Sequence, residues 1–86
     1  MIGYCFCGSF CTVEKSIATL RSLRAEGNDI LPVMNDSVYF CDTRFGKAED
    51  IRRTVETICG REIVHTVVGA EPIGPSVRLD MLVIAP

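Results

Sequence analysis

Apolar runs and an amphipathic segment alternate along the first third of this chain. Residues 2–7 form an apolar run that Gly8 closes, as expected of a buried strand. Apolar residues then recur at helical spacing over residues 13–26, and Gly27 suits the position just after a helix. A second apolar run covers residues 29–34. This order predicts a strand–helix–strand unit, in which the two strands are parallel.

Three residues refine this prediction. Thr12 is a residue type that caps helix N-termini, so we expect it to cap the first helix. Glu14 then lies in the first turn, where the helix dipole favours a carboxylate. Pro32 lacks an N–H donor and therefore favours an edge position for the second strand.

The remaining sequence predicts a loop, a helix and a last strand. Residues 35–46 are polar with scattered aromatic residues and predict a long loop, a feature that is often functional. The apolar residues of 48–58 lie on one helical face, and Gly60 follows them. Residues 61–70 fit a strand or a helix equally well. The apolar run 79–84 predicts a buried strand.

Composition limits the classes of function. The 86 residues are enough for one domain, with 48% hydrophobic residues and a mean hydropathy of +0.27. Such a composition is typical of strands covered by helices on both faces, so we expect further cover from additional sequence or from partner subunits. The net charge of −2 is evenly spread, which argues against nucleic-acid binding and against a membrane surface.

The expected environment is a reducing cytoplasm. No secretory signal precedes the first apolar run, and no apolar run approaches the roughly 18 residues that span a bilayer. Five cysteines, an odd number, then indicate free thiols. The chain ends directly after its last predicted strand, so we expect it to be the N-terminal part of a longer protein.

The turn after the first strand is the best candidate site. Gly8 lets the backbone approach a ligand, and the following helix presents N–H groups to an anion. The hydroxyls of Ser9 and Thr12 would add hydrogen bonds to a phosphate. The known glycine-rich nucleotide fingerprints are absent, so an ordinary strand-to-helix turn remains the alternative.

Other reactive residue types fit structural roles better than sites. Cys5, Cys7 and Cys11 lie close together, but a zinc site needs four ligands and His65 is distant in sequence, so no metal site is predicted. Cys11, beside a helix N-terminus, is either a thiol of lowered pKa or part of the cap. We interpret His65 as a structural histidine.

Arg44 is the candidate for anion binding outside the first turn. Its guanidinium offers a planar fork of donors for a carboxylate or phosphate, although a solvated loop arginine is the alternative. Asp36 follows the second strand where dinucleotide folds hold a ribose, but the glycine fingerprint is missing. Glu71 is interpreted as a turn residue.

Several short blocks resemble the family of dipicolinate synthase B subunits, within the flavoprotein superfamily of flavin-dependent decarboxylase-like proteins. The Thr-Arg-Phe-Gly block at 43–46 and the Ala-Glu-Pro-x-Gly-Pro block at 70–75 point to this family rather than to the superfamily alone. The remaining matches are Ile2-Gly3, Gly8-Ser9, Cys11-Thr12, Pro32-Val33, Leu79-Asp80 and Val83-Ile84-Ala85-Pro86.

The resemblance implies an α/β fold: a Rossmann-like, three-layer parallel sheet of order 2-1-3 for the part present. Residues 1–86 would be the N-terminal part of a single flavoprotein-like domain about twice this size. The implied function is NAD(P)-linked oxidation of dihydrodipicolinate to dipicolinate during endospore formation, in the mother-cell cytoplasm. The implied partner is the A subunit of dipicolinate synthase, which would bring NAD(P), and the full-length protein would form trimer-based homo-oligomers.

The superfamily also implies FMN as a cofactor. Carried over by position, the cofactor-binding residues are Gly8, Ser9, Asn35, Ser37, Ala85 and Pro86. Asn35 stands where relatives often have threonine, and the histidine that serves the decarboxylases is absent from residues 8–12, which argues against decarboxylation. Two alternatives remain: a flavin- or nucleotide-binding module without catalysis, and an inactive truncated fragment.

Overall fold

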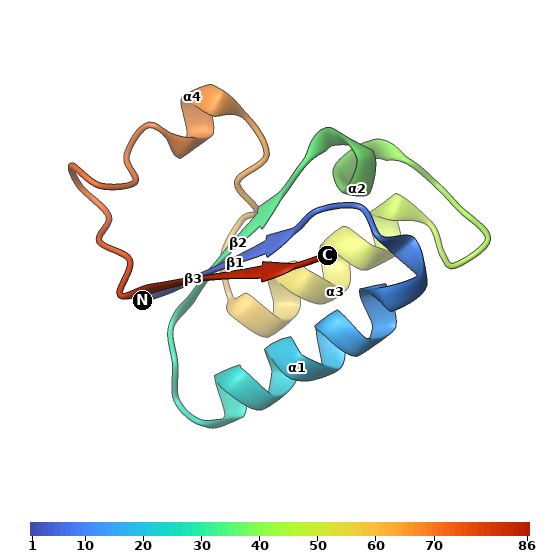
Figure 1. Cartoon of the computed structure of the whole chain (residues 1–86), viewed down its shortest axis with the longest axis horizontal. Helices are drawn as coiled ribbons and strands as arrows, with labels where there is room; N and C mark the ends of the chain where they lie inside the picture. Colours follow the sequence, from blue (N-terminus) through green and yellow to red (C-terminus); the bar gives the residue numbers. More distant parts are fainter.

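The computed structural model describes all 86 residues and contains a three-stranded parallel sheet (Figure 1). The strand order is β2-β1-β3, so the predicted topology is confirmed. In chain order the elements are β1 (Ile2–Phe6), the 3-10 helix η1 (Phe10–Thr12), α1 (Val13–Ala25), β2 (Ile30–Met34), α2 (Asp36–Phe40), α3 (Ala48–Cys59), α4 (Val67–Ala70) and β3 (Met81–Ala85).

The three strands end at the same level of the sheet. Phe6 of β1 pairs with Met34 of β2 on one side and with Ala85 of β3 on the other. Because all three strands run in the same direction, the residues that follow them leave from one edge. This register therefore brings three separate loop starts together.

The ambiguous segment 61–70 contains both kinds of structure. Val64 is extended and pairs with the outer side of β2, accepting from Met34 N at 2.9 Å and donating to Pro32 O at 2.9 Å. The nitrogen of Pro32, which has no hydrogen to donate, therefore faces this outer side. Beyond β2 there is only the single bridge to Val64, so the predicted edge position of β2 is confirmed. Residues 67–70 form the short helix α4.

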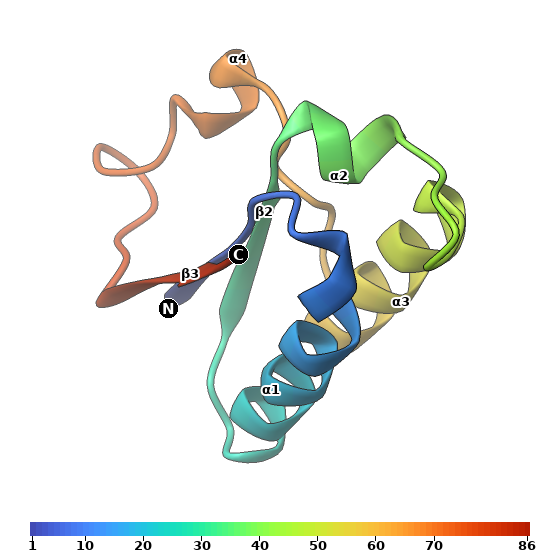
Figure 2. The ribbon, with the colours of Figure 1, turned by 45° about the vertical axis from the view of Figure 1, so that its right-hand side comes forward.

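Helices α1 and α3 lie side by side on one face of the sheet (Figures 1 and 2). Tyr4, fully buried beneath α1, donates from its hydroxyl to Ser16 O at 2.7 Å. Apolar side chains from the sheet and both helices form one buried core. Its members are Tyr4, Phe6, Val13, Leu20, Ile30, Met34, Val38, Ile51, Val55, Cys59, Ile63 and Ala85.

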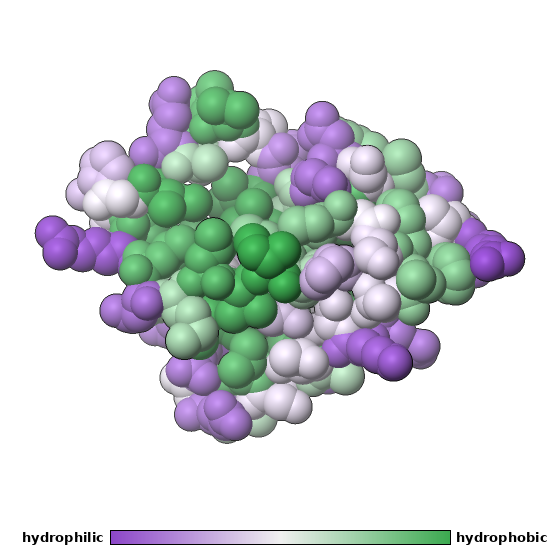
Figure 3. Space-filling view, in the orientation of Figure 1, coloured by the Kyte–Doolittle hydropathy of each residue, from purple (hydrophilic) through white to green (hydrophobic).

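The opposite face of the sheet has much less cover. The segment that contains α4 and leads into β3 crosses this side (Figure 2). Leu82 and Ile84 of β3 remain 55% and 57% exposed. The space-filling view shows a broad hydrophobic area on this face (Figure 3). Of the three layers expected, the chain provides the sheet and one complete helical layer.

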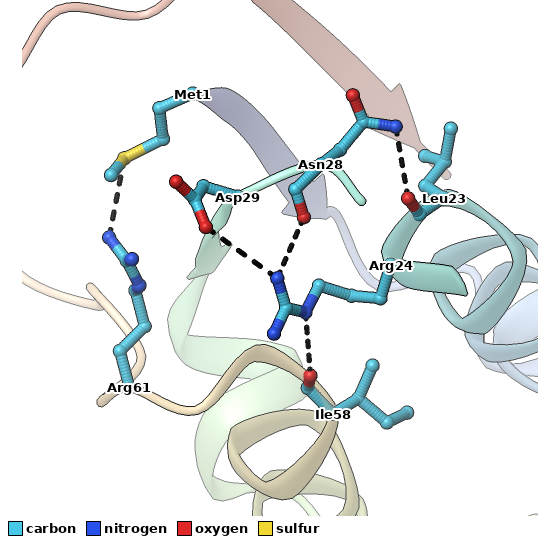
Figure 4. Close-up of polar contacts among 7 residues, drawn as sticks. All are labelled: Met1, Leu23, Arg24, Asn28, Asp29, Ile58 and Arg61. Atoms are coloured by element: carbon cyan, nitrogen blue, oxygen red, sulfur yellow. Dashed lines mark hydrogen bonds and ion pairs between the residues drawn. The ribbon is translucent and has the colours of Figure 1, made fainter. Parts of the chain in front are cut away.

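Arg24 holds the elements together at the opposite end of the strands (Figure 4). Its guanidinium donates to Ile58 O at 3.0 Å and to Asn28 O at 2.8 Å, and it lies 3.6 Å from the carboxylate of Asp29. These contacts join the ends of α1 and α3 to the start of β2. The helical layer is thereby tied to the sheet at the edge remote from the candidate site.

Two local predictions were wrong. The first helix spans Val13–Ala25 as predicted to within a residue, but Thr12 makes no side-chain cap because a 3-10 turn precedes the helix. Residues 35–46 are not one long loop, since they contain α2, which buries Val38 completely. No helix combines the length and apolar character needed to cross a membrane.

Candidate functional site

The candidate site lies where the three strands end. Asn35 N donates to Phe6 O at 3.3 Å, and Cys7 N donates to Ala85 O at 3.3 Å. The Thr12 hydroxyl lies 2.6 Å from Pro86 O and 2.8 Å from Ser9 O, so it links the first turn to the end of β3. The structure therefore brings Gly8, Ser9, Asn35, Ser37, Ala85 and Pro86 to one edge.

Asn35 organises this edge. Its Nδ2 donates to Cys7 O at 2.9 Å, and its Oδ1 accepts from Val38 N at 3.1 Å, capping α2. The side chain thus joins the turn after β1 to the helix after β2. Because its oxygen and one amide hydrogen are already used, Asn35 shapes the site and has little capacity left to hold a ligand.

Gly8 adopts a backbone conformation that favours glycine, with φ of 104°. A Cβ atom placed there would lie 3.7 Å from Asn35 Nδ2 and 3.7 Å from Ser37 Cβ. The turn therefore passes directly over the start of α2. A side chain at this position would strain the backbone and occupy the space between the two loops.

The first turn presents a run of free donors. None of the backbone N–H groups of residues 8–11 donates a hydrogen bond within the chain. Consecutive free N–H groups before a helix form an anion-binding site, to which the dipole of α1 contributes. The Ser9 hydroxyl contacts only Cys11 Sγ, at 3.7 Å, and Ser37 is exposed. The donor set fits a phosphate monoester.

Arg44 belongs to a different place. It lies in a tight turn closed by Thr43 N to Gly46 O at 3.0 Å and Gly46 N to Thr43 O at 3.1 Å. Its guanidinium lies 4.9 Å from the centroid of the Phe45 ring and makes no hydrogen bond or ion pair with the strand-end residues. The structure does not join Arg44 to the turn after β1.

An apolar hollow of about 190 Å³ lies between this tight turn and the start of α1. Phe45, which is 51% exposed, forms one wall, and Phe10 contributes to the lining. Sequence reasoning missed this hollow, because its walls come from two separate segments, residues 10–17 and 45–51.

The remaining sequence candidates are His65, Asp36, Glu71 and the cysteines. The His65 ring stacks on Tyr39, with centroids 3.7 Å apart and planes at 15°, which agrees with a structural histidine. Asp36 is the exposed first residue of α2, and Glu71 is exposed at the end of α4. The cysteines form no cluster with the geometry of a metal site. Burial raises the pKa of the Cys5 thiol, as does the nearby Cys7.

Comparisons with known proteins give one consistent relationship. The chain is 38% identical over 85 residues to the B subunit of dipicolinate synthase from Bacillus subtilis (strain 168), covering 99% of this chain and 42% of the relative. A crystal structure of the B subunit of dipicolinate synthase from Bacillus halodurans C superposes with a TM-score of 0.80 at 33% identity, covering 99% of this chain and 44% of the other. No family model matches the chain. It spans less than half the length of these relatives.

Proposed function

Because the predicted similarity to the B subunit of dipicolinate synthase is confirmed over the whole chain, we propose that this protein contributes to dipicolinate synthesis as part of such a subunit. The reaction is the NAD(P)-linked oxidation of dihydrodipicolinate during endospore formation, in the mother-cell cytoplasm. The partner is the A subunit of dipicolinate synthase, which binds the nicotinamide cofactor, and the full-length protein forms trimer-based homo-oligomers.

The observation that supports a cofactor role is the run of free N–H donors at residues 8–11, before the start of α1. FMN bound there would supply a two-electron carrier. Its phosphate would accept from the turn around Gly8 and from the hydroxyls of Ser9 and Ser37. Ala85 and Pro86, at the end of β3, would form the third side of the site. Asn35 keeps the first two loops in register.

A binding module without its own catalysis is the second candidate. The strand-end residues include neither histidine nor lysine, and Asp36, between Asn35 and Ser37, carries an exposed carboxylate on α2. Such a site binds and orients a phosphate ligand but offers no evident group for proton transfer. In an enzyme of two different subunits, this arrangement would leave the redox step to the partner.

FMN binding tests the cofactor role, which both candidates share. Titration of the chain with FMN, followed by flavin fluorescence, is expected to show saturable binding that Ser37→Ala weakens severalfold. Ser76→Ala, an exposed serine in the segment before β3, is the matched control. Absence of saturable binding, or equal loss in both variants, would contradict the cofactor role. Dipicolinate formation upon mixing with the A subunit tests the enzyme role.

Arg44 is proposed as an anchor for a substrate carboxylate. Its guanidinium is exposed over Phe45, beside the apolar hollow, and has no ion-pair partner in the chain. In the assay with the A subunit, Arg44→Gln is expected to raise KM for the dicarboxylate severalfold with little change in kcat. Arg78→Gln, another exposed arginine, is the control. An unchanged KM would assign Arg44 to the solvated surface.

A further inference from the structure

The Thr12 hydroxyl has little capacity left to donate to a ligand. It lies 2.6 Å from Pro86 O and 2.8 Å from Ser9 O, and both of these oxygens are main-chain acceptors. A threonine hydroxyl has one hydrogen, so the two oxygens share it. A phosphate oxygen is also an acceptor and would find no free donor here. Thr12 therefore differs from Ser9, whose hydroxyl contacts only Cys11 Sγ.

The bond to Ser9 O fixes the direction of the peptide group between Ser9 and Phe10. Ser9 O accepts from Thr12 Oγ1 and also from Thr12 N, the latter at 3.0 Å. In a planar trans peptide the C=O and N–H groups point in opposite directions. Because Ser9 O points toward Thr12, the Phe10 N–H points away from Thr12, where no group of the chain accepts its hydrogen. Thr12 thereby sets the direction of one of the free donors in the turn.

The bond to Pro86 O joins the same turn to the end of β3. The start of the turn is attached to β3 as well, since Cys7 N donates to Ala85 O at 3.3 Å. Residues 8–11 therefore lie between two contacts with the end of one strand. The contact from Thr12 is made by a side chain, so a substitution can remove it and leave the main chain unaltered.

We propose that Thr12 is a positioning residue for phosphate binding. Its hydroxyl holds the turn after β1 against the end of β3 and keeps the Phe10 N–H directed at the phosphate. The residue acts through Ser9 and Pro86 and does not contact the ligand itself. This inference rests on the phosphate role proposed above for the turn, and it adds a coupling between that turn and the end of β3.

Phosphate titration of isotope-labelled protein, followed by amide NMR, tests the positioning role with inorganic phosphate as the probe. In the wild type, the amide signals of residues 9–11 are expected to shift saturably. Thr12→Val removes the hydroxyl but keeps the branched shape, and it should weaken phosphate binding about fivefold, the effect of one lost hydrogen bond. Thr12→Ser keeps the hydroxyl and should bind phosphate within about twofold of wild type. Thr54→Val is the matched control, because its hydroxyl donates to Asp50 O at 2.8 Å within α3, and it should leave binding unchanged.

Amide hydrogen exchange tests the link to β3 without any ligand. The Cys7 N–H, which donates to Ala85 O, should exchange faster in Thr12→Val than in the wild type and in Thr54→Val. Equal exchange in all three proteins would overturn the link between the turn and β3.

Two results of the titration would overturn the positioning role. The first is equal phosphate affinity of Thr12→Val and the wild type. The second is a Thr12→Ser variant that binds as weakly as Thr12→Val, because the hydroxyl would then not be the group that matters. Absence of saturable binding by the wild type would instead contradict the phosphate site itself, and the exchange rates would still decide the link to β3.

Discussion

Replacing Asn35 tests whether one side chain holds the candidate site together. Asn35→Ala removes the hydrogen bond to Cys7 O and the cap on Val38 N. Loss of an N-cap costs about 1 kcal/mol, and loss of an exposed hydrogen bond costs up to about 1 kcal/mol. The free energy of unfolding should therefore fall by about 1–2 kcal/mol.

Asn35→Asp separates the two contributions. The aspartate oxygen still caps α2, and its charge is favoured by about 0.3–1 kcal/mol at a helix N-terminus. The donor to Cys7 O is replaced by a carboxylate oxygen that repels this carbonyl, so the link between the loops is lost while the cap stays, and the net destabilisation should be about 1 kcal/mol. Urea unfolding followed by far-ultraviolet circular dichroism measures both variants. An Asn35→Ala variant within about 0.5 kcal/mol of wild type, the range of neutral surface changes, would refute the proposed role.

Three further predictions concern single groups. Tyr4→Phe removes the buried hydrogen bond to Ser16 O and should lower the free energy of unfolding by about 1 kcal/mol, seen as a Tm decrease of about 4–8 °C; an unchanged Tm would show that this bond contributes nothing. Burial raises the pKa of the Cys59 thiol, so at mildly alkaline pH it should react with iodoacetamide much more slowly than the exposed Cys11, as peptide mass spectrometry would show; equal rates would contradict the buried position. The N-terminal amine donates to the carboxylate of Asp80 at 2.6 Å and holds the pKa of this carboxyl below the ordinary 3.8. The stabilisation from this contact is therefore present above the unfolded-state pKa and disappears as pH falls through the folded-state pKa. NMR titration of Asp80 should find a midpoint below 3.8, and acetylation of the amine should raise that midpoint.

Residues whose signals are local were predicted well. Apolar spacing and the glycine after it located α3, and Gly60 adopts the left-handed conformation at its end. Pro32 indicated the edge position of β2, because a residue without a backbone N–H limits strand pairing in any fold. Parallel strand order followed from the resemblance and from the limited number of allowed crossovers.

Residues whose roles depend on distant partners were predicted less well. Thr12 has the side chain of an N-cap, but a 3-10 turn places its hydroxyl beside Pro86 O, 74 positions away. The assignment of Asn35 to the cofactor stays a prediction, and only the tertiary structure shows that its amide also joins two loops. Its signal was present, since Asn three residues before Val38 fits a cap, but five helical residues are too few to show periodicity.

The sequence alone determined the kind of elements, their order and the turn that carries the candidate site, because apolar spacing, glycine and proline act through nearby backbone. Tertiary structure decided which groups stay free. Only the folded chain shows that the N–H groups of residues 8–11 lack partners, that Arg44 lies apart from them, and that Leu82 and Ile84 remain uncovered. Each of these properties depends on where segments remote in sequence pack in the folded chain. No local sequence pattern specifies this packing.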